Sequence, residues 1–342
     1  MIKTINAWRG LFAVSIALYH FNVRFIVQEQ LVWAGVVFFF AAGGFLHMEH
    51  HGHMAATWPQ WRAFMRKRAA GIYPMHWLAL VLVMWAQAHF LHRGVDGVTL
   101  TLNALLLHPW VPVRSVYLSF NGPAWFLGAL LWCYALAPLL ARVFNRMNAA
   151  TAMAATAVWW TAMAVTRATA STALGDFMHF CPLVRMGDFM MGMALHRVFT
   201  ALRQRRQWHR HAFALEAGVV AAVAASWTLN MVCPPARVLN ESLLWWPSMG
   251  LLIVVAALLH GHESPLGKIL LIKPLQWLGK YSYEIYLFQM VAAGLFGFIL
   301  FTIGAHYGVN LRGEGWACFA ILLLLAPPLQ RLNKWIKKRL AA

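Results

Sequence analysis

The sequence predicts an all-α integral membrane protein with about ten transmembrane helices and both termini in the cytoplasm. Of its 342 residues, 61% are hydrophobic and only 11% are charged. Soluble domains average about 45–50% apolar and about 25% charged residues. The apolar residues extend over the whole length, and no periodic repeat or polar region divides the chain. We therefore expect a single transmembrane domain, residues 1–342, without a separate soluble domain.

Ten segments are apolar and long enough to span a membrane, because about 20 apolar residues cross a bilayer core of about 30 Å. We expect the spans at 6–27, 31–48, 71–91, 123–144, 149–168, 179–199, 213–232, 243–260, 281–303 and 314–330. The stretch between the third and fourth spans, about 92–122, contains LTLNALLLHPW. That run is too short to span and is compatible with a re-entrant or interfacial helix.

The distribution of lysine and arginine gives these spans an orientation. With ten spans, 20 of the 28 basic residues lie on the side that the termini share and six lie on the other side. The remaining two, Arg9 and Arg185, lie within spans. Basic residues concentrate in cytoplasmic loops, so we expect a multi-pass protein of the plasma (inner) membrane with cytoplasmic termini. The net charge of +18 is thereby explained by topology, and no nucleic-acid partner is implied.

The first span, NAWRGLFAVSIALYHF at 6–21, contains two ionisable residues. Arg9 and His20 are eleven residues apart, which is three helical turns plus about 20°, so both lie on one helix face about 16 Å apart. We expect Arg9 near the cytoplasmic end and His20 deep in the membrane, where a histidine can exchange a proton near physiological pH. The alternative is a buried histidine bonded to a neighbouring helix and an arginine that extends to the surface.

A basic run, RAFMRKRAAGIYP at 62–74, precedes the third span. Such a run is either a topology signal or a site for an anionic cytoplasmic ligand, because arginine forks bind phosphate oxygens in pairs. Pro74 is compatible with a break near the start of the span.

Polar residues also occur in later spans. Arg185 and Asp188, in VRMGDFMMG, are three residues apart and can pair on one helix face, which favours a structural ion pair. Trp125, in NGPAWFLG, is interpreted as an interfacial anchor. Gln289, in LGKYSYEIYLFQM, lies too deep for a simple surface role. The histidines of HMEHHGHM at 47–54 lack the spacing of a tetrahedral metal site, and no metal is predicted.

Six segments, in order along nearly the whole chain, resemble the acyltransferase-3 family of multi-spanning O-acyltransferases. They are NAWRGLFAVSIALYH, FFFAAGGFL, RKRAAGIYPMHWLAL, AWFLGALLWCYALAPLL, VRMGDFMMGMAL and LGKYSYEIYLFQM. The resemblance implies transfer of an acyl group, often acetyl, from cytoplasmic acyl-CoA to a hydroxyl of a glycan or lipid-linked acceptor. It also implies that His20 is the catalytic histidine, Arg9 its companion and Arg68 a donor-site arginine.

The chain departs from the family pattern at several positions. Gly71 stands at the second arginine of the Arg-x-x-Arg segment, Gly43 at the serine of Ser-Gly-Phe, and Gln289 at the ninth-helix histidine. We expect the acyl-CoA donor, with no permanently bound cofactor, to be bound by Arg66, Lys67, Arg68 and Tyr73. We expect substrate binding or structural support from Trp125, Arg185, Asp188, Tyr286 and Gln289.

The expected acceptor is an envelope or exported polysaccharide or a lipid-linked sugar, followed by a small secreted metabolite, and membrane lipids surround the chain. Two other functions stay open. One is a transporter or flippase in which Arg9, His20, Arg185 and Asp188 line a path. The other is a non-catalytic membrane protein that kept the fold.

Overall fold

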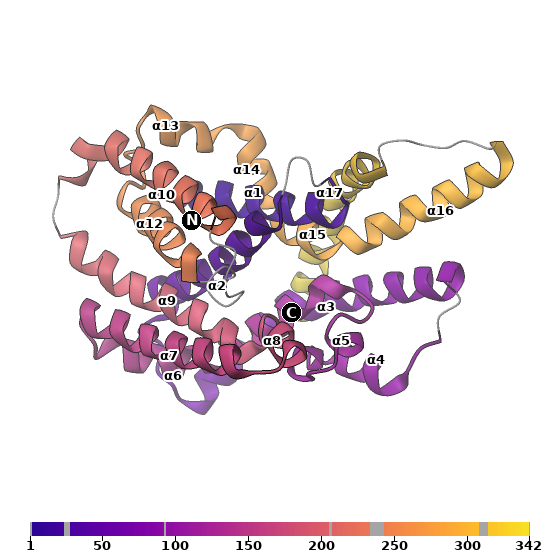
Figure 1. The fold of residues 1–342 in the computed structure, drawn as a ribbon, viewed down its shortest axis with the longest axis horizontal. Coiled ribbons are helices and arrows are strands. Elements are labelled where there is room, and N and C mark those ends of the chain that lie inside the picture. Colours follow the sequence, from indigo (N-terminus) through magenta and orange to yellow (C-terminus); the bar gives the residue numbers. More distant parts are fainter. Residues whose placement is uncertain are drawn as a thin grey trace.

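The structure is a computed structural model that describes residues 2–23, 28–91, 94–204, 207–232, 243–307 and 314–341. Within these ranges every regular element is a helix (Figure 1). The long helices are α1 (Lys3–His20), α2 (Glu29–His51), α3 (Trp58–Leu91), α6 (Trp125–Asn145), α7 (Ala149–Thr169), α9 (Pro182–Leu202), α10 (Ala212–Val232), α12 (Trp246–Leu258), α16 (Gln289–Tyr307) and α17 (Glu314–Ala341).

Shorter helices connect the long ones. The short α-helices are α4 (Gly97–Ala104), α5 (Arg114–Tyr117), α8 (Thr172–Met178), α13 (Pro265–Lys268), α14 (Lys273–Lys280) and α15 (Ser282–Leu287). Single turns of 3-10 helix are η1 (His108–Trp110), η2 (Gly122–Ala124), η3 (Trp208–His211), η4 (Leu243–Trp245) and η5 (Ile269–Leu271).

Each of the ten predicted segments overlaps at least one helix. In the described residues, six helices are long and apolar enough to cross a membrane: Glu29–His51, Trp58–His89, Gly122–Asn145, Ala149–Thr166, Trp208–Val232 and Glu314–Leu340. Trp246–Leu258 and Gln289–Leu300 are apolar but shorter. The all-α class is therefore confirmed for the described residues, while the number of ten crossings and the cytoplasmic position of the termini stay predictions.

Several boundaries differ from the prediction. Helix α1 ends at His20 rather than at 27, and residues 24–27 lie outside the described residues. Helix α3 begins at Trp58, so the basic run is helical, and it continues through Pro74 without the expected break. Helices α6, α16 and α17 pack against α3, and such packing lets a membrane helix tolerate a proline. The ninth segment is divided at Phe288, between α15 and α16.

The crossing of α2 and α9 depends on two glycines. A Cβ atom on Gly44 would lie 1.9 Å from the Phe189 carbonyl oxygen, and one on Gly192 would lie 1.8 Å from the Ala41 carbonyl oxygen. The helix backbones can come this close only because these residues carry no side chain. Gly43, in contrast, has room for a Cβ, with its nearest neighbour at 3.4 Å.

Helix α1 is held against α14 in the same manner. A Cβ on Gly10 would lie 2.5 Å from the Gly279 nitrogen, and a Cβ on Gly279 would lie 2.0 Å from the Asn6 carbonyl oxygen. The Asn6 amide Nδ2 donates to the Gln276 backbone oxygen at 3.2 Å and to its Oε1 at 3.1 Å. The residue after Arg9 therefore fixes the position of α1, and with it the position of Arg9.

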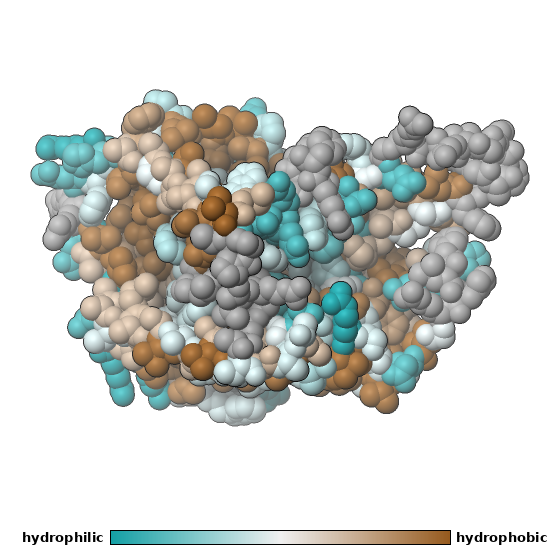
Figure 2. All heavy atoms as spheres, in the orientation of Figure 1, coloured by the Kyte–Doolittle hydropathy of each residue, from teal (hydrophilic) through white to brown (hydrophobic). Residues whose placement is uncertain are grey.

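The surface carries many apolar side chains. Leu324 and Val232 are 76% and 70% exposed, which lipid, but not water, would favour. Figure 2 shows hydrophobic residues over α10, α12 and α13, with hydrophilic residues at the left edge beside the α9–α10 connection. This distribution is the one expected of an integral membrane protein.

Candidate active site

Helix α1 carries Arg9 and His20, the two ionisable residues of the first predicted span. It is continuous from Lys3 to His20, so Arg9 and His20 stay on one face about 16 Å apart. Arg9 is partly buried in the first half of the helix, and His20 is its exposed last residue. The Arg9 guanidinium therefore belongs to the N-terminal half of α1, and the His20 imidazole lies at its C-terminal end.

The His20 ring contacts one buried amide, that of Gln289. His20 Nδ1 lies 3.0 Å from Gln289 Oε1, and Gln289 Nε2 donates to the Tyr286 backbone oxygen at 2.9 Å. The second bond assigns the amide orientation and turns Oε1 toward the ring. Because Oε1 can only accept, Nδ1 carries the proton in neutral His20. The lone pair is then on Nε2.

The break between α15 and α16 positions Gln289. Leu287, the last residue of α15, has a backbone oxygen that accepts from Asn121 Nδ2 at 3.0 Å, and the Tyr286 hydroxyl donates to the Pro123 backbone oxygen at 2.7 Å. The segment around η2 therefore satisfies polar groups at the break. Asn121 was missed from the sequence, although the Asn-Gly-Pro opening of the fourth span was a signal for it.

Cations and one carboxylate gather around the first half of α1. The Arg68 guanidinium carbon lies 4.5 Å from the Tyr134 ring centre and 4.8 Å from that of Phe64. Tyr134 interacts electrostatically with both Arg68 and Arg9, and Glu284 interacts with Arg9 and Lys337. We call Arg9, Arg68 and Lys337 the cationic cluster. It combines α1, α3 and α17, and Lys337 was missed because it resembled the other lysines of a basic C-terminal helix.

The other predicted donor residues lie elsewhere. Arg66 and Lys67 are exposed, because consecutive helical residues are rotated by about 100° and only Arg68 of the three points inward. The Tyr73 hydroxyl donates to the Leu105 backbone oxygen at 3.0 Å, on the side of α3 that faces α4. The structure thus places Arg68 and Arg9 near the same side chain, Tyr134, and it does not bring Arg66, Lys67 or Tyr73 to that place.

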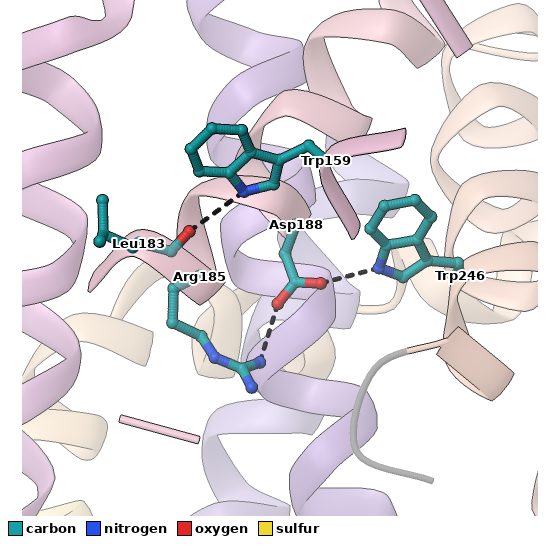
Figure 3. A network of polar contacts seen from close by, with 5 residues as sticks. All are labelled: Trp159, Leu183, Arg185, Asp188 and Trp246. Carbon is teal, nitrogen blue, oxygen red and sulfur yellow. Dashed lines mark hydrogen bonds and ion pairs between the residues drawn. The ribbon is translucent and has the colours of Figure 1, made fainter. Parts of the chain in front are cut away.

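Arg185 and Asp188 form an enclosed pair on α9. Arg185 Nη1 donates to Asp188 Oδ2 at 2.8 Å, and both side chains are only 1% exposed. Trp246 of α12 donates from Nε1 to the other carboxylate oxygen at 2.7 Å (Figure 3). The pair therefore links α9 to α12, as a structural ion pair would.

Trp125, which the sequence predicted as an interfacial anchor, is buried within the protein. It is 6% exposed, and its ring centre is 5.1 Å from that of Phe180 and 5.5 Å from that of His179. It supports the packing of α6 against the α8–α9 connection.

The polar side chains near the C-terminal end of α2 contact different partners and do not converge on one point. His196 Nε2 lies 2.8 Å from Glu49 Oε2, and His50 Nδ1 lies 2.9 Å from the Leu46 backbone oxygen. Buried His47 packs against Phe64 and His51. Among the described residues, no three His, Cys, Asp or Glu side chains are arranged to hold a metal ion.

A comparison with known families agrees with this arrangement of motifs. A family model described as an acyltransferase domain matches residues 2–330. No curated protein and no solved structure gives a significant match. The match covers nearly the whole chain, including α1, α3, α6, α9 and α15. This protein therefore belongs to the acyltransferase-3 family.

Proposed function

We propose that this protein is a membrane O-acyltransferase that moves an acyl group, with acetyl favoured, from cytoplasmic acyl-CoA to an acceptor hydroxyl. The acceptor class is an envelope or exported polysaccharide or a lipid-linked sugar. Family membership supports acyl transfer. The observation that carries the proposal is the His20–Gln289 contact at 3.0 Å, which leaves a basic nitrogen on an exposed ring.

The cationic cluster is suited to the donor. Acyl-CoA carries phosphates, and guanidinium groups bind phosphate oxygens well. Arg68 and Arg9 bind the donor in this proposal, while exposed Arg66 and Lys67 attract it at longer range. The thioester then extends along α1 toward His20.

The reaction begins when the acceptor hydroxyl oxygen attacks the thioester carbonyl carbon and His20 Nε2 takes the hydroxyl proton. The tetrahedral intermediate collapses, the carbon–sulfur bond breaks, and the departing thiolate takes the proton back from His20. The products are the ester and free CoA. A positioned general base contributes about 10²–10⁴-fold to the rate.

A relay is the variant of this mechanism. Here His20 Nε2 attacks the thioester carbonyl carbon, the carbon–sulfur bond breaks, and His20 becomes an acyl-imidazolium. CoA leaves as a thiolate and takes a proton from water, and the proton that the imidazole later receives from the acceptor hydroxyl returns to water. The acceptor hydroxyl then attacks the acyl carbon, the bond to Nε2 breaks, and the hydroxyl proton passes to the imidazole. A relay allows the acceptor to approach after CoA has left.

The test uses purified full-length protein, labelled acetyl-CoA and the variant His20→Ala. We expect loss of transfer and of hydrolysis by about 10²–10⁴-fold, with acetyl-CoA binding retained. His53→Ala, which removes an exposed histidine that follows α2, is the matched control. Full turnover by His20→Ala would refute the catalytic role.

The same protein preparations separate the rival functions. A transporter or flippase predicts a pH- or gradient-dependent flux and no affinity for acyl-CoA, and a non-catalytic partner predicts neither flux nor turnover. The transporter path would need Arg185 and Asp188, and these two charges are paired and only 1% exposed. That observation weighs against the path.

A further inference from the structure

The cationic cluster contains more positive than negative charge. Arg9, Arg68 and Lys337 come from three helices, and Glu284 is the carboxylate, among the described residues, that interacts electrostatically with Arg9 and Lys337. Glu284 Oε1 accepts from Asn333 Nδ2 at 3.3 Å, and its Oε2 is buried without a hydrogen bond in the described structure. One carboxylate cannot neutralise three cations. The excess charge favours an anion at this place.

Lys337 has donors available for such an anion. Its ammonium interacts electrostatically with Glu284 but makes no direct ion pair or hydrogen bond with any of the described residues. The side chain is exposed, so a ligand can reach it from solvent. An ammonium has three N–H donors, and here they stay available.

The Lys337 ammonium lies beside residue 71 of α3. A Cβ on Gly71 would lie 3.8 Å from Lys337 Nζ and 3.9 Å from its Cε. A Cβ fits at these distances with ordinary contacts, whereas a side chain as long as arginine would extend toward the Lys337 ammonium. Residue 71 lies one turn after Arg68 on α3, so Gly71 places the ammonium beside the same helix face as Arg68.

We propose that Lys337 of α17 binds a phosphate of the acyl-CoA donor together with Arg68, and that Gly71 provides the space for it. The inference rests on the proposed function and names a donor-binding residue that the basic run at 62–74 does not include. The Lys337 ammonium of α17 thus lies beside α3 at residue 71, where glycine has no side chain.

The test measures acetyl-CoA binding to the full-length protein by calorimetry. Lys337→Ala should weaken binding about tenfold to a hundredfold, the range expected when a hydrogen bond to a charged group is lost. Lys338→Ala, which removes the neighbouring exposed lysine, should change it less than about twofold, as expected for a surface charge. Turnover of a small acetyl thioester without phosphates should be equal in wild type and Lys337→Ala.

A second pair of variants moves the cation from α17 to α3. Gly71→Arg alone should weaken binding, because the new guanidinium competes with Lys337 for one space. Gly71→Arg combined with Lys337→Ala should bind acetyl-CoA more tightly than Lys337→Ala alone. This reversal keeps the inference testable even if one single variant folds poorly.

The outcomes separate the inference from the proposed function. If wild type binds acetyl-CoA and Lys337→Ala binds it equally well, the role of Lys337 is refuted and the function stands. Equal weakening by Lys337→Ala and Lys338→Ala would also refute it, since any surface charge would then suffice. If wild type does not bind acetyl-CoA, both proposals fail.

Discussion

The side-chain amide of Gln289 contacts the His20 ring, and an amide does not change its protonation state with pH. An amide oxygen accepts hydrogen bonds at every pH, whereas an imidazole in the same place could donate or accept. The Tyr286 backbone oxygen fixes the amide, and the amide fixes the imidazole tautomer. Gln289 is a positioning residue, because it acts on the reaction through His20.

Gln289→Leu should lower turnover about twofold to tenfold, because the variant loses one hydrogen bond of about 0.5–1.5 kcal/mol that selects the reactive tautomer. Acetyl-CoA affinity should stay unchanged, since Gln289 lies at the far end of α1 from the cationic cluster. Steady-state kinetics and calorimetry on the same preparation check both statements. Gln330→Leu, which removes a partly buried amide that donates to the Lys280 backbone oxygen, serves as the control. Unchanged turnover in Gln289→Leu would contradict the tautomer argument.

The Arg185–Asp188 pair concerns stability rather than chemistry. Asp188→Leu leaves a buried guanidinium beside an apolar group and removes the acceptor of the Trp246 indole. Loss of one partner of a buried pair costs about 3–5 kcal/mol, while apolar replacement of both is often nearly neutral. We therefore expect a lower melting temperature in detergent for Asp188→Leu and partial recovery in Arg185→Met/Asp188→Leu. A fully stable Asp188→Leu variant would show that the pair is not structural.

Helices in this fold approach one another where glycines remove the side chains between them. The α1–α14 crossing uses Gly10 and Gly279, and the α2–α9 crossing uses Gly44 and Gly192. Lipid supplies little hydrophobic force between helices, so close packing has to hold them together. These crossings fix α1, α2 and α9 in the centre of the bundle, from which α1 presents Arg9 and His20.

Gly192→Ala should destabilise the protein by about 1–3 kcal/mol, the range for an overpacked core, because the new methyl group would lie 1.8 Å from the Ala41 carbonyl oxygen. Gly218→Ala on α10 is the matched control, since no atom lies within 4 Å of its Cβ position. Alanine there should leave the melting temperature unchanged or raise it, by about 0.4–1 kcal/mol of stability. Thermal melts of both variants measure the difference. Equal effects would refute the close-packing argument.

The broken ninth segment shows how an irregular backbone is used. A continuous helix would leave Gln289 on a regular face, whereas the interruption at Phe288 turns its amide toward the end of α1. The backbone and hydroxyl groups at the break have partners in the segment 121–123. Non-helical backbone inside a membrane bundle is tolerated where protein groups satisfy it.

The arrangement of the whole molecule gives the proposed reaction a direction. The predicted topology places the cationic cluster toward the cytoplasm and His20 toward the opposite side of the membrane. A donor from the cytoplasm and an acceptor from the opposite side would then meet along α1. Figure 1 shows α16 and the end of α3 extending away from the rest of the bundle on the right.

The orientation can be measured by cysteine labelling in intact cells. A membrane-impermeant maleimide should label Asp96→Cys, at the exposed start of α4, and should label Lys338→Cys only after the membrane is opened. Cys133, Cys181 and Cys318 are buried, and Cys233, outside the described residues, is replaced by serine in the background. Labelling of Lys338→Cys in intact cells would place the C-terminus outside and overturn the positive-inside assignment.

The all-α class, the approximate helix positions and the shared face of Arg9 and His20 could be predicted from the sequence alone. They follow from composition, from apolar segment length and from the helical period, all of which act locally. The family was indicated separately, by the resemblance of six segments in order along the chain. The sequence could not show that α3 continues through Pro74 or that Trp125 is buried, because both depend on neighbouring helices.

The packing of the helices in three dimensions sets which side chains contact one another. His20 and Gln289 are 269 residues apart in the chain, and Lys337 reaches Gly71 from the last helix. No period or spacing encodes such pairs, because they depend on how the glycine crossings set the helices against one another. The same packing turns Arg68 inward and leaves Arg66 and Lys67 outside. The residues of the candidate site were therefore largely visible in the sequence, but their partners were not.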